Sequence, residues 1–345
     1  MKQIQPHRHN GRFYNDAHDS IIARLKNVPR VLWSVIKQGL KGHRRNKVLL
    51  GDHRIEAWID QSLPLAASQD LVVTWIGHAA FLMQIDGFNI VTDPVFSDIS
   101  YFVKRLIKSP IQPHHLPPID VIVISHNHAD HTDKASLRAL VPHQPRVFVP
   151  MGNKAWFEKL GFLHVTEMMW GDKAAVTKVD KELTITFLPA SHWTGRGLFD
   201  INTTLWGSWM LSTTHDNVYF AGDTAYDKHF AHIATLFPSI TLALMPIGPN
   251  EPRTLLYDAH ISAQEAVKAF LTLGARHFIP MHWGTFMFGL EGFHGPLQRL
   301  KESWKLEGER MDDKVMHVVK FGEQRRIVGD APVELSHEQQ GHTSL

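Results

Sequence analysis

Hydrophobic residues that follow position 71 are grouped in short runs that predict β-strands. Residues 72–76, 80–85 and 88–92 are rich in β-branched and aromatic side chains. The last two runs are joined by Asp86-Gly87, a dipeptide typical of a two-residue hairpin turn. We therefore expect a β-sheet to begin near residue 71.

The next runs have the spacing of strands that are joined by helical connections. Residues 121–124 form a continuous apolar run that ends directly in Ser125-His126, and a second apolar run lies at 147–149. Residues 154–160 then show a helical pattern. This order predicts neighbouring strands with helices packed beside them.

The second half of the chain repeats this plan. Strands are predicted at 183–188, 206–211, 218–220 and 242–247, and helices at 262–273 and 296–304. Gly77 leads through a hairpin to Asp93, and Gly207 leads through a hairpin to Asp223, with a separation of 16 positions in each case. We interpret this as an internal duplication. The expected fold is α/β, a four-layered αββα sandwich, with a site at the seam where strand ends meet.

Residues 1–70 are interpreted as an N-terminal extension, 71–330 as one hydrolase domain and 331–345 as a polar tail. Within the extension, 21–47 has the pattern of a basic amphipathic helix, which Pro29 should break or kink. One interpretation is an arm that rests on anionic lipid headgroups. The other is a helix that packs on the core and turns its basic face to solvent.

The amino-acid composition restricts the kinds of metal ligand and partner but does not indicate a function. The chain has 43% hydrophobic and 20% charged residues and a formal net charge of +2, which favours no particular partner. It has no cysteine, so any metal must bind through nitrogen and oxygen. The first twenty residues contain no apolar run of the kind found in signal peptides, so we expect a cytoplasmic protein. The 24 histidines are the unusual feature.

Four metal-competent side chains lie within residues 125–131, directly after the predicted buried strand. Residues i and i+2 of an extended segment share a face, so His126 and His128 can hold one ion together. Asp130 and His131 then face a second ion. Neither pair completes a coordination shell, because a catalytic zinc ion usually takes three or more protein ligands.

Three later residues have the character of the missing ligands. His192, Asp223 and His282 each follow a hydrophobic run that reads as a strand. Each alone would more simply be a loop histidine or a turn aspartate. Together with the first cluster, they complete two metal sites.

At these residues the sequence resembles the metallo-β-lactamase superfamily. It is most similar to the branch that contains N-acylphosphatidylethanolamine-hydrolysing phospholipase D and the ascorbate-6-phosphate lactonases. The resemblance extends from about residue 71 to 289. The segments that carry it are TWIGHAAFL (74–82), TDPVFS (92–97), SHNHADH (125–131), PASHW (189–193), LFDINTTLWGSW (198–209), FAGDTAY (220–226), PIGPNEPR (246–253) and MHWGTF (281–286).

The resemblance implies two zinc ions. It puts His126, His128 and His192 on the first and Asp130, His131 and His282 on the second, with Asp223 bridging them.

Three further residues receive roles. Asp93 is expected to orient a ligand histidine. His78 either lines the site or has a structural role. His260 matches a histidine that contacts the scissile phosphate in the family.

The leading functional hypothesis is a phosphodiesterase of phospholipase D type that acts on N-acylphosphatidylethanolamine-like phospholipids. Two divalent ions suit this reaction because they lower the pKa of a shared water and stabilise charge on the attacking and leaving oxygens. Asp130 would orient the attacking water, and His260 would stabilise the added negative charge. The segment 21–47 would then contact the membrane surface peripherally.

Other functions stay open at this point. The same ligands suit a cytosolic lactonase or a small-molecule phosphodiesterase, and iron or manganese could replace zinc. A metal-binding module without catalysis is the alternative of another class. Nucleic acid is not an expected substrate, because only 58 residues separate Asp223 from His282, where the nuclease branch carries a large insertion. The oligomeric state is not indicated.

Overall fold

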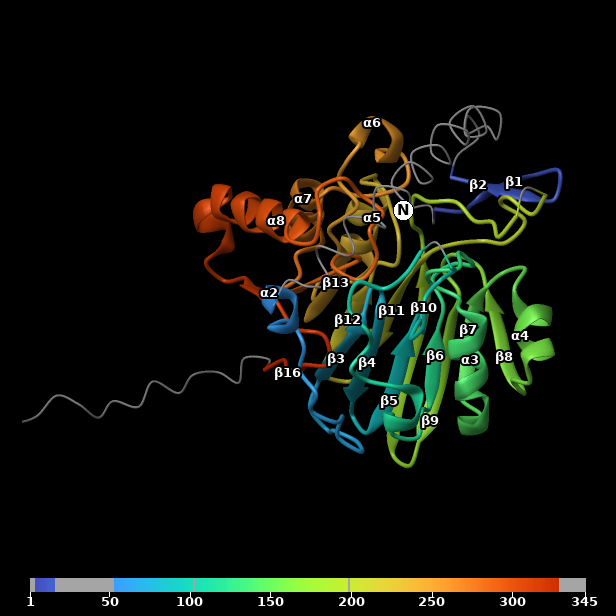
Figure 1. Cartoon of the computed structure of the whole chain (residues 1–345). Helices are drawn as coiled ribbons and strands as arrows, with labels where there is room; N and C mark the ends of the chain where they lie inside the picture. Colours follow the sequence, from blue (N-terminus) through green and yellow to red (C-terminus); the bar gives the residue numbers. More distant parts are fainter. Residues whose placement is uncertain (1–3, 16–52, 102, 198, 329–345) are drawn as a thin grey trace, which may run out of the picture.

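Two seven-stranded sheets form the centre of the computed structural model, which describes residues 4–15, 53–101, 103–197 and 199–328 (Figure 1). The first sheet contains, in spatial order, β16 (Gln324–Arg326), β3 (Val72–Gly77), β4 (Ala80–Ile85), β5 (Phe88–Thr92), β6 (Val121–Val123), β7 (Arg146–Pro150) and β8 (His164–Met168). The second contains β15 (Val315–Met316), β14 (His277–Met281), β13 (Leu242–Pro246), β12 (Asn217–Phe220), β11 (Ser208–Ser212), β10 (Lys181–Leu188) and β9 (Lys173–Lys178).

The central strands of the first sheet, β3 to β6, are buried on both faces, which explains their nearly continuous hydrophobic sequences. Phe81 and Met83 of β4 belong to the larger core cluster, which also contains the apolar side chains of the second sheet. Leu82, between them, belongs to a separate cluster with Leu137 and Phe157 from the helices outside. Because side chains alternate along a strand, one strand supplies both cores.

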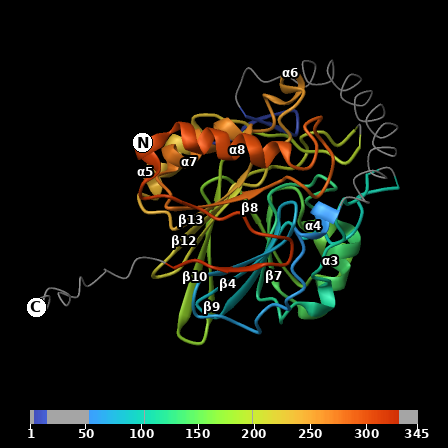
Figure 2. The same cartoon turned by 60° about the vertical axis from the view of Figure 1, so that its left-hand side comes forward.

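Helices cover the outer face of each sheet. The first sheet is covered by α3 (Lys134–Leu140) and α4 (Lys154–Leu160), and the second by α5 (His229–Leu236), α7 (Ala263–Leu273) and α8 (Gly295–Leu306). Figure 2 shows α7 and α8 lying across one side of the paired sheets, away from α3. The predicted αββα sandwich is therefore confirmed.

The two halves follow the same strand plan, as the repeated spacing predicted. In the first half β4 pairs antiparallel with β5, which pairs parallel with β6; in the second half β11, β12 and β13 do the same. The hairpin at Asp86-Gly87 is present, with Ile85 opposite Phe88 and both turn residues at positive φ. The topology thus agrees with an internal duplication.

Several boundaries and elements differ from the sequence-based expectation. β11 begins at Ser208 rather than at residue 206, because the Trp206 side chain leaves the strand pattern and donates to the carbonyl of Ala190. The elements α3, α5, β8 and β9 were not predicted. β8 and β9 have mostly exposed or half-buried side chains, so their sequences lack the apolar runs that mark the central strands.

A short hairpin near the N-terminus, β1 (His7–His9) and β2 (Arg12–Tyr14), packs on the loop that precedes β11. The Phe13 amide donates to the Asn202 carbonyl, and the Phe13 side chain joins the larger core. Residues 21–47 and the tail 331–345 lie outside the described residues, so the predicted basic helix and the three-part division of the chain stay predictions. No helix in the described part of the chain could cross a membrane.

Candidate metal centre

The loop after β6 brings the first cluster of predicted ligands together. The amides of His131 and Thr132 both donate to the His128 carbonyl, and the Thr132 hydroxyl donates to the His126 carbonyl. This tight turn directs the side chains of residues 126–131 toward one region, at the end of the strand. The predicted convergence of the motif is therefore present.

Three ring nitrogens form the first donor group. His126 Nε2 lies 2.9 Å from His128 Nδ1, and His192 Nε2 lies 3.3 Å from the same His128 atom. His192 reaches this point from the loop that follows β10. His126 and His192 are 66 positions apart in the sequence, and the structure brings them together with His128.

The second donor group gathers around the carboxylate of Asp130. His131 Nε2 and His282 Nε2 lie 3.6 and 3.8 Å from Asp130 Oδ2. His282 follows β14, and its backbone has a positive φ of 61°. The structure therefore also brings the three predicted ligands of the second site together.

Asp223 lies between the two groups. Its Oδ2 atom is 3.3 Å from His131 Nε2 and 3.1 Å from His282 Nε2, and 3.9 Å from His192 Nε2 in the first group. Asp223 follows β12 at the position that corresponds to Asp93 after β5. This placement agrees with a carboxylate that is shared by two ions.

The donor atoms have the features expected of a metal centre. Buried atoms that find no hydrogen-bond partner among the described residues include Nε2 of His131, Nε2 of His282 and Oδ1 of Asp223. Buried polar atoms are rarely left unpaired, so the convergence of these atoms on one region fits the binding of a cation. The nitrogen and oxygen donors present fit divalent transition metals.

Protonation also suits metal binding. Burial lowers the pKa of His128 to about 4 and holds the pKa values of His126 and His192 well below the ordinary range. Burial would raise the pKa of Asp130, but the positive charge at His131 and the hydrogen bond from His78 outweigh it and lower the pKa. Neutral imidazoles and an ionised carboxylate are the forms that bind metals.

Asp93 contacts one predicted ligand histidine directly and a second through Ser125. Its Oδ2 atom accepts from His131 Nδ1 at 2.7 Å and from the Ser125 hydroxyl at 2.5 Å, and Ser125 Oγ lies 2.9 Å from His126 Nδ1. The predicted orienting role of Asp93 therefore has a direct contact behind it. Ser125, which extends this contact to His126, was not singled out from the sequence, although it opens the 125–131 motif.

His192 is held from both sides. Its Nδ1 atom lies 2.7 Å from the Ala259 carbonyl, which fixes the ring so that Nε2 faces the site. Asn15, from the N-terminal hairpin, donates to the His192 carbonyl at 3.1 Å and accepts from the His192 amide at 3.3 Å. It also accepts from Trp206 Nε1. Nothing in the sequence around Asn15 indicates this role.

We expect Asn15→Ala to weaken metal binding about tenfold, because outer contacts of metal ligands contribute on this scale. The measurement is competition with a chromophoric chelator. His9→Ala, an exposed change on the same hairpin, serves as the control. Equal metal affinity in both variants would show that Asn15 does not hold His192 in place.

His260 lies beside Asp223, at the edge of the predicted site; its contact with a phosphate stays a prediction. Its Nδ1 atom lies 3.6 Å from Asp223 Oδ2, and its side chain is 18% exposed. Burial lowers the pKa of His260 to about 4, so the ring is neutral near pH 7. With Asp130 and His128, it is one of the partly exposed members of the site, so a substrate can approach from this side.

Arg253 fixes the loop that carries His260. It begins α6 (Arg253–Leu256), donates to the His260 carbonyl at 2.6 Å, and pairs with Glu265 at 2.5 Å. Glu265 in turn accepts from the Ser262 amide in the capping box of α7. The loop is therefore anchored to the start of a helix.

Arg253→Ala should lower kcat about 10- to 100-fold with metal content unchanged, because a small displacement of a positioned group reduces rates on this scale. Steady-state kinetics and metal analysis of the same preparation test this. Arg326→Ala, which removes an exposed pair with Asp70, is the matched control. Loss of metal from the Arg253 variant would contradict a role confined to His260.

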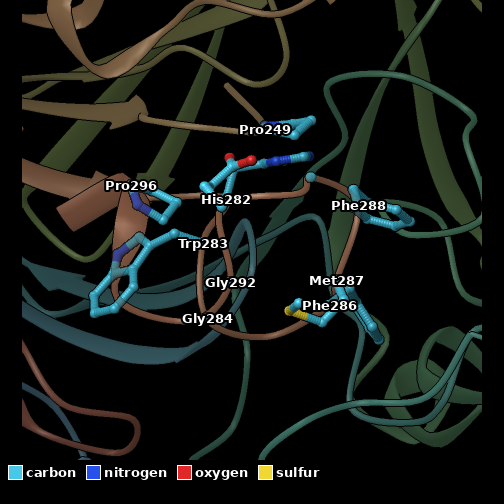
Figure 3. A pocket seen from close by; sticks show the side chains of 11 residues that line it. Pro249, His282, Trp283, Gly284, Phe286, Met287, Phe288, Gly292 and Pro296 are labelled. Atoms are coloured by element: carbon cyan, nitrogen blue, oxygen red, sulfur yellow. The ribbon is translucent and has the colours of Figure 1, made fainter. Parts of the chain in front are cut away.

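A small pocket lies beside His282. Figure 3 shows the His282 ring at one side of this pocket, next to Pro249 and Phe288, with Trp283, Phe286 and Met287 around the remainder. Glu291 is the one acidic residue that lines it. The second donor group thus adjoins a largely apolar wall.

Comparison with known protein families identifies the superfamily of this chain. A family model described as "Beta-lactamase superfamily domain" matches residues 88–283, which contain the 125–131 motif and every later predicted metal ligand through His282. The chain belongs to the metallo-β-lactamase superfamily. Its αββα fold is the one that the sequence motifs implied.

Curated relatives narrow this assignment. The chain is 37% identical over 246 residues to "N-acyl-phosphatidylethanolamine-hydrolyzing phospholipase D 1" of Caenorhabditis elegans, covering 67% of this chain and 69% of that protein. It is also 37% identical over 237 residues to the mitochondrial enzyme of that type from Saccharomyces cerevisiae, covering 66% of this chain and 50% of the yeast protein. This metallo-β-lactamase superfamily member therefore resembles the phospholipase D branch.

Solved structures show the same fold. Igni18, a metallo hydrolase from Ignicoccus hospitalis, superposes with a TM-score of 0.58 at 21% identity, covering 75% of this chain and 99% of that one. Several relatives are named hydrolases, and the structure clusters residues that could hold a metal. The chain is therefore a metal-dependent hydrolase.

Proposed function

We propose that the protein is a binuclear zinc phosphodiesterase of phospholipase D type that cleaves N-acylphosphatidylethanolamine-like phospholipids. The observation that carries this proposal is the pair of adjoining donor groups that share Asp223. His126, His128 and His192 would hold one ion and Asp130, His131 and His282 the other, both with Asp223. When bound, two divalent ions lower the pKa of a water and offset negative charge on phosphate oxygens.

The chain's own residues would position the reactants. Asp130 is the partly exposed carboxylate of the site, with a side chain that is 17% exposed, and it can accept a hydrogen bond from the attacking water. His260, neutral and partly exposed, can donate a hydrogen bond to a phosphate oxygen from the opposite side of Asp223. Arg253 keeps that ring in place through the His260 carbonyl.

Apolar side chains stand beside the proposed site and could contact part of a lipid substrate. Phe286, Met287 and Phe288 line the pocket beside His282, and Trp193 packs on the His128 ring at 4.4 Å. Aromatic and thioether surfaces bind hydrocarbon and disfavour a small charged sugar. With the named activity of the worm and yeast relatives, this favours a phospholipid over a sugar-phosphate lactone or a soluble diester.

Contact with a membrane surface is part of this proposal. Residues 21–47 carry the basic amphipathic pattern. Deleting them should weaken binding to anionic vesicles more than it lowers cleavage of a soluble diester. Unchanged vesicle binding would remove this part and leave the phospholipase assignment intact.

The experiment that tests the function is product analysis by mass spectrometry. The zinc-loaded full chain is incubated with N-acylphosphatidylethanolamine in detergent micelles, beside His128→Ala and the control His215→Ala, an exposed histidine in the turn between β11 and β12. N-acylethanolamine and phosphatidic acid should be released by the wild type and the His215 variant only. Cleavage of a soluble diester or lactone without lipid products would instead favour a small-molecule hydrolase, and metal binding without any hydrolysis a non-catalytic module.

A further inference from the structure

His78 belongs geometrically to the second donor group, although the sequence alone predicts only a place lining the site or a structural role. Its Nε2 atom lies 3.0 Å from Asp130 Oδ2. Its ring centre lies 3.9 Å from that of His282 and 5.0 Å from that of His131. One donor atom from each of these four residues lies within 4.8 Å of the others.

The contact between His78 and Asp130 has the length of a ligand-to-ligand distance. An ion about 2.0–2.2 Å from each donor holds neighbouring donors about 2.8–3.6 Å apart. Several pairs already assigned to the metals fall in this range, including 2.9 Å for His126 with His128 and 3.1 Å for His282 with Asp223, whereas His282 with Asp130, at 3.8 Å, lies just above it. The 3.0 Å between His78 and Asp130 fits the same pattern.

Three imidazole nitrogens surround one oxygen of the Asp130 carboxylate. Asp130 Oδ2 lies nearest to Nε2 of His78, then 3.6 Å from Nε2 of His131 and 3.8 Å from Nε2 of His282. These nitrogens come from three separate chain segments. Together with the Asp130 oxygen they could surround one ion. A simple hydrogen bond would require only one of them.

The backbone around His78 is fixed in a conformation that directs the ring inward. His78 has a positive φ of 57°, which is unfavourable for a residue with a Cβ atom. Its amide donates to Thr285 Oγ1 at 2.6 Å, and its carbonyl accepts from Trp75 Nε1 at 3.1 Å and from the His282 amide at 3.2 Å. Such strain persists where the surroundings impose it, typically at functional sites.

We propose that His78 is a ligand at the second metal position. This inference rests on the proposed binuclear site. The first position then has four protein donors, from His126, His128, His192 and Asp223. The second has five, from His78, Asp130, His131, His282 and Asp223.

Unequal donor numbers predict unequal metal preference. Four nitrogen and oxygen donors suit tetrahedral zinc, whereas five suit ions that take five or six ligands, such as Mn²⁺. Mn²⁺ should therefore compete with Zn²⁺ at the second position and not at the first. The chemistry of the second position would depend on His78 as much as on His282.

The test measures binding of Mn²⁺ and Co²⁺ alone to the metal-free full chain. His128→Ala is used as the parent so that the first position is impaired, and His78→Ala and His78→Gln are added to it. Free Mn²⁺ is followed by electron paramagnetic resonance, and Co²⁺ coordination by visible absorption. Gln places an amide N–H where it can still donate to Asp130, but it does not replace an imidazole ligand.

Both changes at His78 are expected to weaken Mn²⁺ binding at least tenfold. The Co²⁺ spectrum should gain intensity as the site falls from five protein donors toward four. Thr92→Ser, which changes a buried residue outside the site, controls for general loosening of the fold.

Rescue by Gln to within about twofold of the parent affinity would overturn the proposal, because it would show that His78 only holds Asp130 through a hydrogen bond. Failure of the phospholipase assignment would be seen separately, since these measurements contain no substrate. If the wild type binds a single Co²⁺ equivalent that His78 changes do not affect, the ligand proposal and the binuclear site both fail.

Discussion

Asp130→Asn should lower kcat/KM by about 10³-fold, a change that lies within the range contributed by general acid–base groups. Among the metal-competent carboxylates of the site, Asp130 has a partly exposed side chain, whereas those of Asp93 and Asp223 are at most 1% exposed. It is therefore placed to touch both a metal ion and the attacking water. Asn has the same shape but no negative charge and one acceptor oxygen fewer.

The ionised state of Asp130 explains why the loss should be large. In the metal-free chain burial raises the pKa of Asp130, but the neighbouring His131 charge and the His78 hydrogen bond lower it by more, so the carboxylate is charged across the neutral range. An uncharged amide cannot draw the water proton in the same way. Steady-state kinetics on a soluble diester and on a lipid substrate would measure the loss.

The matched control is Asp180→Asn, at an exposed carboxylate in the turn between β9 and β10. Thermal unfolding of the metal-loaded variants should show that Asp130→Asn keeps the fold. Wild-type turnover by Asp130→Asn would remove this residue from the chemical step. A large loss of both metal content and turnover would instead assign Asp130 to metal binding alone.

Metal removal is the second change with a large expected effect. Chelation should abolish hydrolysis and lower the thermal midpoint by about 10 °C. An ion present at about 1,000 times its Kd stabilises the folded chain by about 4 kcal/mol. For a large domain, each kcal/mol shifts the midpoint by about 2–4 °C.

The structure explains why the metal-free chain would be less stable. The imidazoles of His126, His131 and His192 are fully buried side by side, and Asp223 Oδ1 has no hydrogen-bond partner among the described residues. Unpaired buried polar groups destabilise the fold by about 1–3 kcal/mol each. The charge pairs of His131 with Asp93 and Asp223 offset part of this loss.

Differential scanning calorimetry with and without chelator, followed by readdition of Zn²⁺, measures the thermal midpoint. An activity assay on the same samples measures hydrolysis. His128→Ala, which lacks one donor of the first group, should show a smaller shift than the wild type. An unchanged midpoint together with retained activity after complete chelation would contradict a metal-dependent site.

Sequence alone determined the features of this protein that depend on neighbours along the chain. The spacing of His126, His128, Asp130 and His131 places their side chains on one turn after a buried strand, so the cluster could be recognised without a fold. Asp86-Gly87 defined a hairpin because its turn requires residues that tolerate positive φ. Alternating and continuous apolar runs located the central strands because burial selects those side chains.

Only the tertiary structure decided which distant residues complete the site. Asn15 holds the backbone of His192 across 177 positions, and Thr285 holds the amide of His78 across 207. These contacts depend on how the two sheets are paired and on where loops at the strand ends meet, and single polar residues carry no periodic signal. Local spacing therefore predicted which residues could bind metal. The packing of the sheets determined which residues contact these ligands from outside and placed His78 beside Asp130.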